Sequence, residues 1–66
     1  MKVYINDTEI EVFRGAKLEN ALRRYSQEVY REVVKGEKIV RDQYGNQQLL
    51  KGSLRSESAY RVEEAD

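Results

Sequence analysis

The sequence predicts a single small α+β domain, in which one helix packs across one face of a mixed sheet of four to five strands. Apolar and polar residues alternate through the first thirteen positions, which is typical of a strand hairpin with one buried face. A stripe of apolar residues with helical spacing comes next. Short apolar blocks separated by turn residues complete the chain, so strands flank a central helix.

The opening hairpin is predicted from two alternating segments. Val3 and Ile5 alternate with polar neighbours, and so do Ile10 and Val12. We therefore expect these four side chains on the face that the helix covers. The intervening residues 6–8 read Asn-Asp-Thr, and Asn and Asp tolerate the left-handed backbone that a tight hairpin turn requires.

The helix is expected from Ala16 to about Val34. Its stripe has spacings of three and four residues and consists of Leu18, Leu22, Tyr25, Val29 and Val33. Because the stripe keeps its phase across Ser26, the pattern favours one continuous helix that ends near Gly36. Residues 27–35 are rich in β-branched and aromatic side chains, so a strand is the alternative for this segment.

Three short strands are expected after the helix, at residues 38–42, 48–50 and 58–62. Leu54 is expected to reach the core from a loop. The last strand is expected to pair in parallel with the first, at the centre of the sheet. The folded domain is thus predicted to span residues 1–62, and residues 63–66 are expected to form a flexible acidic tail.

The composition argues against catalysis and against cofactors. The chain contains no cysteine and no histidine, which leaves neither a disulfide, nor a thiolate metal site, nor an imidazole base. Glu9 and Glu11 share one strand face, and serines lie near Lys51, but both patterns are typical of solvent-facing strands and loops. We expect no enzymatic activity, no cofactor and no bound metal.

Charge and hydropathy restrict the partners and the location. Twelve basic residues balance twelve acidic ones, whereas a dedicated polyanion binder usually has a basic excess. No apolar run approaches the length needed to span a bilayer, and the first residues lack the apolar stretch of a signal peptide. The expected location is therefore the cytoplasm, away from membranes.

Three segments carry a resemblance to a known superfamily. They are residues 2–12 (KVYINDTEIEV), residues 15–22 (GAKLENAL), and the closing stretches 40–46 (VRDQYGN), 52–54 (GSL) and 60–62 (YRV). These segments resemble the opening hairpin, the helix entry and the ending of β-grasp (ubiquitin-like) proteins. That superfamily includes sulfur carriers, TGS domains and plant-type ferredoxins. Since the matching residues serve folding, the resemblance implies the fold rather than an activity.

Two departures from the superfamily bear on function. Sulfur carriers and ubiquitin-like modifiers end in Gly-Gly, whereas this sequence ends in Glu-Glu-Ala-Asp. Plant-type ferredoxins hold an iron–sulfur cluster with four cysteines, and this chain has none. Neither chemistry can therefore be carried over to this chain.

The favoured hypothesis is a non-enzymatic protein-interaction or adaptor module that acts through its sheet face or an exposed strand edge. The five tyrosines support it, because tyrosine is enriched at interfaces. The alternative is a small RNA-contacting domain with a basic helix face, as in TGS-like domains, although acidic residues interleave with the basic ones.

The candidate interaction residues are Tyr4, Tyr30, Tyr44, Arg23, Arg24, Arg31 and Lys38. Another protein is the expected partner, with nucleic acid less favoured, and we expect a monomer or a weak homodimer paired through strand edges.

Overall fold

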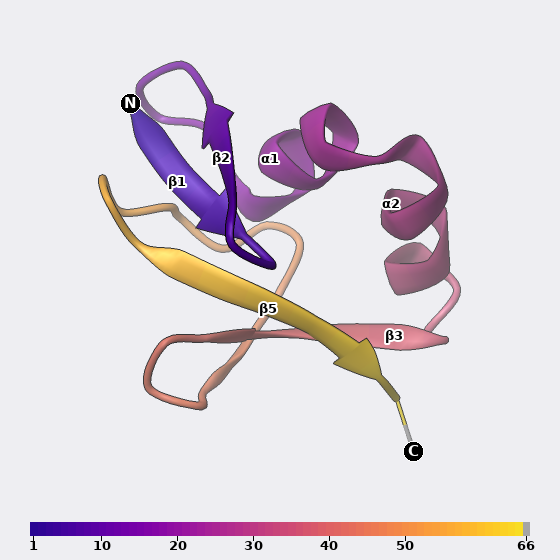
Figure 1. Cartoon of the computed structure of the whole chain (residues 1–66). Helices are drawn as coiled ribbons and strands as arrows, with labels where there is room; N and C mark the ends of the chain where they lie inside the picture. Colours follow the sequence, from indigo (N-terminus) through magenta and orange to yellow (C-terminus); the bar gives the residue numbers. More distant parts are fainter. Residues whose placement is uncertain (66) are drawn as a thin grey trace.

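The computed structural model describes residues 1–65 and is an α+β domain with a five-stranded mixed sheet and two helices (Figure 1). In chain order its elements are β1 (Lys2–Ile5), β2 (Thr8–Glu11), α1 (Leu18–Tyr25), α2 (Gln27–Val34), β3 (Lys38–Asp42), β4 (Gln47–Gln48) and β5 (Ala59–Glu64). The order of strands across the sheet is β2-β1-β5-β3-β4. The fold class predicted from the sequence is therefore confirmed at the level of an α+β domain with a mixed sheet.

The last strand lies at the centre of the sheet. β5 runs parallel to β1 and antiparallel to β3, as expected from the sequence. β1 and β2 form an antiparallel hairpin around Asn6 and Asp7, whose φ angles of 48° and 68° both lie in the left-handed region. Two such residues make the hairpin turn whose twist matches that of the strands.

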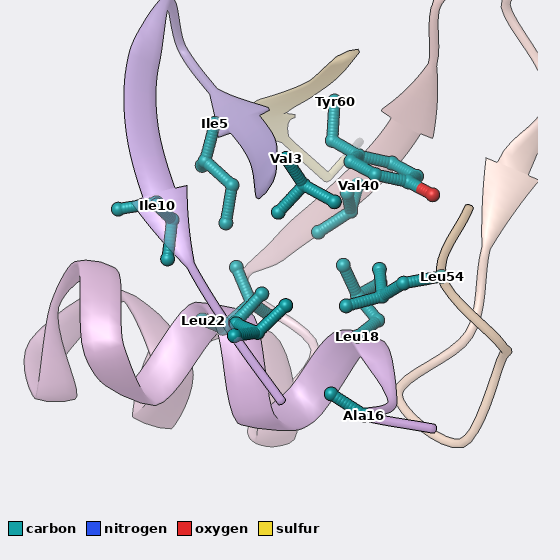
Figure 2. Packing of buried hydrophobic residues seen from close by; sticks show 11 residues of the cluster. Val3, Ile5, Ile10, Ala16, Leu18, Leu22, Val40, Leu54 and Tyr60 are labelled. Atoms are coloured by element: carbon teal, nitrogen blue, oxygen red, sulfur yellow. The ribbon is translucent and has the colours of Figure 1, made fainter. Parts of the chain in front are cut away.

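The core lies between the sheet and α1. All four predicted hairpin residues are buried, and Leu18, Ala21 and Leu22 of α1 meet them from the other side. Figure 2 shows Val3, Ile5 and Val40 pointing from the strands toward Leu18 and Leu22. Leu54 reaches the same cluster from a loop, as predicted. Complete burial of an aliphatic side chain stabilises the fold by about 1.5–3 kcal/mol.

The helical segment is divided at Ser26, so the prediction of one continuous helix is wrong. Ser26 has an extended backbone (φ −167°, ψ 123°). Its N–H donates to the Leu22 carbonyl at 2.8 Å, and its Oγ accepts from the Val29 N–H at 3.2 Å. One serine thus ends α1 and caps α2. Residues 27–34 are helical, so the strand alternative for this segment is also wrong.

The acidic residues expected to form a tail belong partly to the sheet. Glu63 and Glu64 are the last residues of β5 and pair with Ile39 and Lys38 of β3. Lys38 Nζ lies 2.7 Å from a carboxylate oxygen of Glu64. A cross-strand cation of this kind makes an acidic residue compatible with a strand. Asp66, the last residue of the predicted tail, lies outside the described residues.

The strand expected at residues 48–50 is displaced to Gln47–Gln48. The chain leaves the sheet because Leu49 begins a tight turn, in which the Gly52 N–H donates to the Leu49 carbonyl at 2.8 Å. A Cβ at Gly52 would lie only 3.0 Å from that oxygen, so glycine suits the turn. The Leu50 carbonyl then accepts from the Glu19 N–H at 3.0 Å, which fixes the turn to the start of α1.

Neither described helix is long or apolar enough to cross a bilayer.

Candidate protein-interaction site

The seven candidate interaction residues do not form one site. Tyr4 lies on β1, on the sheet face opposite the buried Val3 and Ile5. Tyr44 lies in the turn between β3 and β4, and its side chain is 78% exposed. Lys38 begins β3, and the three arginines and Tyr30 lie on the two helices. The fold therefore separates residues that the sequence analysis groups together.

Arg23 and Tyr30 bind each other across the two helices. Arg23 Nη2 donates to the Tyr30 hydroxyl at 2.8 Å, and the guanidinium carbon lies 4.5 Å from the centre of the Tyr30 ring. Glu19 also approaches Arg23, at 4.0 Å. This contact joins α1 to α2 and engages two of the residues that the RNA hypothesis assigns to binding. Arg24 and Arg31 are exposed, and neither forms an ion pair with any residue in the range 1–65.

The open face of the sheet carries paired charges. Arg41 and Arg61 stand opposite each other on β3 and β5, and each has its own acidic partner. Arg41 Nε lies 3.1 Å from Glu63, and Arg61 Nη2 lies 3.6 Å from Asp7. These carboxylates offset the repulsion that two facing arginines would otherwise produce.

Glu9 and Glu11, the carboxylate pair noted in the sequence, lie on the same open face. Glu9 approaches Lys2 at 3.8 Å, and Glu11 lies 3.2 Å from the ammonium group of Met1. Each carboxylate is thus paired with a cation from β1 or its start. The arrangement is a pair of exposed cross-strand ion pairs.

An apolar groove lies at the other edge of the sheet, between the end of α2 and strands β3 and β4. Its volume is about 320 Å³, and it is lined by Val33, Gly36, Lys38, Ile39, Val40, Gln47, Gln48, Leu49, Leu50 and Lys51. Leu49 is 69% exposed at this groove. Among the seven candidate residues, only Lys38 lines it. The remaining lining residues were missed by the sequence analysis.

The charged residues of the groove lining are both lysines, and each is paired with a carboxylate that lies outside the lining. They are Lys38 and Lys51, and none of the lining residues is acidic. The hydrogen bond from Lys38 to Glu64 raises the pKa of the Lys38 ammonium above its ordinary value of 10.5. Lys51 Nζ donates to Glu19 at 2.9 Å, and this hydrogen bond lowers the pKa of the Glu19 carboxyl below 4.5. The Lys38 ammonium is therefore charged at neutral pH.

A second hollow, of about 420 Å³, lies beside the turn between β3 and β4 and includes Asp42, Tyr44, Arg55 and Tyr60 in its walls. The Asp42 carboxylate is used by the turn itself. Its Oδ1 accepts the N–H groups of Tyr44 and Asn46, each at 2.9 Å, and these bonds, that of Asn46 foremost, lower the pKa of Asp42 below 3.8. The Asp42 carboxylate of this hollow thus stabilises a turn.

The sequence contained one signal of the groove. Leu49 and Leu50 are consecutive leucines, so in a regular strand they would point to opposite faces and one would lie in solvent. That pattern is compatible with a strand and also with a chain that leaves a sheet. The turn at residues 49–52 decides between them, and it depends on contacts with α1.

Within residues 1–65 no cluster of three or more potential metal-ligating side chains is close enough to hold a metal ion. No protein-family model, no curated protein and no solved structure matches the chain. A functional proposal therefore rests on the geometry described above.

Proposed function

We propose that this chain is a β-grasp domain that acts as a non-catalytic protein-interaction module, with the groove beside β3 and β4 as its binding site. The strand order β2-β1-β5-β3-β4, with a parallel central pair and the helices on one face, supports the fold assignment. The observation that carries the function is the exposed apolar groove that includes Leu49. A groove of this kind at a sheet edge suits recognition of a peptide segment.

The dimensions of the groove favour a segment of a partner over a small molecule. Its volume of about 320 Å³ lies at the lower limit for small-ligand pockets. It is also open to solvent along the sheet edge, where β4 is only two residues long. A short stretch of another protein can occupy such a groove and continue beyond it on either side.

The RNA hypothesis is the second candidate, and the geometry gives it less support. Arg23 and Tyr30 are joined to each other, and Lys38 is joined to Glu64. The surface also has no excess of positive charge. Arg24 and Arg31 alone leave few phosphate contacts, and affinity for RNA depends on their number.

The test compares three tagged forms of the chain in lysate of the native organism, with and without nuclease: the unchanged chain, Leu49→Glu and Phe13→Glu. Phe13 is the matched control, since it is also an exposed apolar residue, at 63%, and does not line the groove. We expect one protein to be recovered with the unchanged chain and with Phe13→Glu, both with and without nuclease treatment. The same protein should not be recovered with Leu49→Glu. Recovery that is insensitive to Leu49→Glu would contradict the proposal, and recovery that requires intact RNA would favour the second candidate.

A further inference from the structure

We propose that the groove binds an extended partner segment, which pairs with the backbone of Lys38 as an added edge strand and carries an apolar side chain next to a carboxylate. This inference rests on the proposed function and specifies the chemistry of the partner. It follows from three features: an incomplete strand ladder, the apolar wall of the groove, and a lining in which the charged residues are lysines and none is acidic.

The backbone of β3 alternates between its two neighbours. The carbonyl of Glu37 accepts from the Ala65 N–H at 3.0 Å. In this register the backbone N–H and C=O groups of the odd-numbered residues of β3 point toward β5. The even-numbered residues face β4, as shown by the Asp42 N–H, which donates to the Asn46 carbonyl at 2.8 Å. This alternation is the normal pattern of a strand inside an antiparallel sheet.

The ladder between β3 and β4 stops one step early. Val40 pairs with Gln48, and the next step would join Lys38 to Leu50. Leu50 instead gives its carbonyl to the Glu19 N–H. Lys38 therefore has an outward-facing N–H and C=O that form no backbone hydrogen bond with another described residue. One residue of an incoming strand can satisfy both groups.

The walls of the groove determine which side chains an added strand presents. Val33 of α2 and Leu49 and Leu50 of the turn contribute apolar surface to the lining of the groove. Successive side chains of a strand point to opposite faces, so one residue in two can enter the groove. A branched aliphatic side chain suits a space of this size, and removing its apolar surface from water favours binding.

The charge of the groove selects the flanking residues. The Lys51 side chain is 84% exposed, and its partner Glu19 lies outside the groove lining. An exposed ion pair contributes little to stability, so Lys51 can turn to a carboxylate of the ligand at little cost. Since no acidic residue lines the groove, an acidic segment meets no repulsion from its walls. A basic segment would place its charge beside the exposed Lys51, whereas the charge of Lys38 is already balanced by Glu64 at 2.7 Å.

The test uses a display library of random linear peptides, selected on the unchanged chain and counter-selected on Leu49→Glu. We expect enriched peptides with aliphatic residues at alternate positions and Asp or Glu beside them. Bound to the unchanged chain, the tightest peptide should slow hydrogen exchange of the Lys38 amide by about tenfold or more, because that amide gains a partner. Charge reversal by Lys51→Glu should weaken the same peptide by about twofold to fivefold.

Several outcomes would overturn the inference. They are a selection that yields no peptide dependent on Leu49, enriched peptides that are basic, and a bound peptide that leaves exchange of the Lys38 amide unchanged. If the lysate protein still depends on Leu49 in any of these cases, the proposed function survives and only the strand-addition chemistry fails. A peptide that protects Lys38 while no lysate protein depends on Leu49 would contradict the proposed function instead.

A second copy of the chain is the competing occupant, because β2 presents an acidic outer strand with Glu9 and Glu11 exposed. Sedimentation of the chain alone over about a hundredfold range of concentration separates the two cases, since self-association depends on concentration. We expect a monomer throughout, with rapid exchange of the Lys38 amide. A dimer in which Lys38 becomes protected would assign the groove to self-association and overturn the partner segment.

Discussion

The side-chain oxygen of Asn6 accepts a hydrogen bond from the backbone N–H of Val62 at 3.0 Å. The backbone N–H of Asn6 donates to the Tyr60 carbonyl at 3.0 Å, so the side chain adds one more step to the parallel ladder after the main chain has turned away. Its Nδ2 also donates to the Tyr25 hydroxyl at 3.3 Å. A single turn residue thus connects the hairpin, the central strand and the end of α1.

Asn6→Ala is expected to lower the free energy of unfolding by about 1–3 kcal/mol. The substitution removes the acceptor for the Val62 N–H and places alanine at a φ of 48°. Asn6→Gly is the matched variant, because it removes the same side chain and relieves the backbone. Urea denaturation measures both. A loss for Asn6→Ala that Asn6→Gly fully restores would show that the backbone conformation, and not the hydrogen bond, accounts for the effect.

Ser26→Ala is expected to cost about 1 kcal/mol of stability, because the N-cap of α2 is lost. Ser26→Asp should retain most of the stability, since its carboxylate can accept from the Val29 N–H and lies at a helix N-terminus. Chemical denaturation of the two variants under the same conditions is the measurement. Equal losses for alanine and aspartate would contradict a capping role.

The contact between Arg23 and Tyr30 is expected to contribute about 0.5–1 kcal/mol, the range for an exposed cation–π pair. A double-mutant cycle with Arg23→Ala and Tyr30→Ala isolates this coupling energy. Tyr30→Phe then separates the hydroxyl hydrogen bond from the stacking on the ring. Strictly additive single losses would mean that the contact does not stabilise the packing of α1 on α2.

Stability should fall in acid as Glu19 and Asp42 become protonated. Both have a pKa lowered in the folded state, below ordinary values of 4.5 and 3.8. Groups of this kind stabilise the fold above their unfolded pKa, and that stabilisation is lost as the pH falls through the folded pKa. We expect the thermal midpoint to be constant near neutral pH and to decline below pH 4.5. Asp42→Asn should flatten part of the decline, and an unchanged profile would contradict the contribution of Asp42.

The hairpin was predictable because its alternation and its turn are local features of the sequence. The parallel pairing of the last strand was predictable because a last strand needs a partner, and the first strand is available beside it. Val3, Ile5, Ile10 and Val12 alternate, and a two-residue turn fixes their register. Ser26 was missed because α1 and α2 each turn their apolar residues toward the same core. The apolar stripe therefore keeps its spacing across a break, and serine is common inside helices as well as at caps.

The groove could not be predicted from local patterns. It exists because β4 ends at Gln48 and the following turn attaches to α1, an element about thirty residues earlier in the chain. Glu63 and Glu64 were assigned to a tail for a related reason. Their place in β5 depends on cations such as Lys38, which is brought beside them only by the sheet.

The central position of β5 has a consequence for how the protein is made. During synthesis the hairpin, both helices and β3 leave the ribosome before Ala59 does. The strand that separates β1 from β3 therefore emerges after the other four strands of the sheet, and until then the two halves of the sheet have no common neighbour. Because pairing of distant segments sets the pace of folding, the domain can acquire its native structure only after β5 has emerged, and a nascent chain that stalls before β5 exposes two open strand edges.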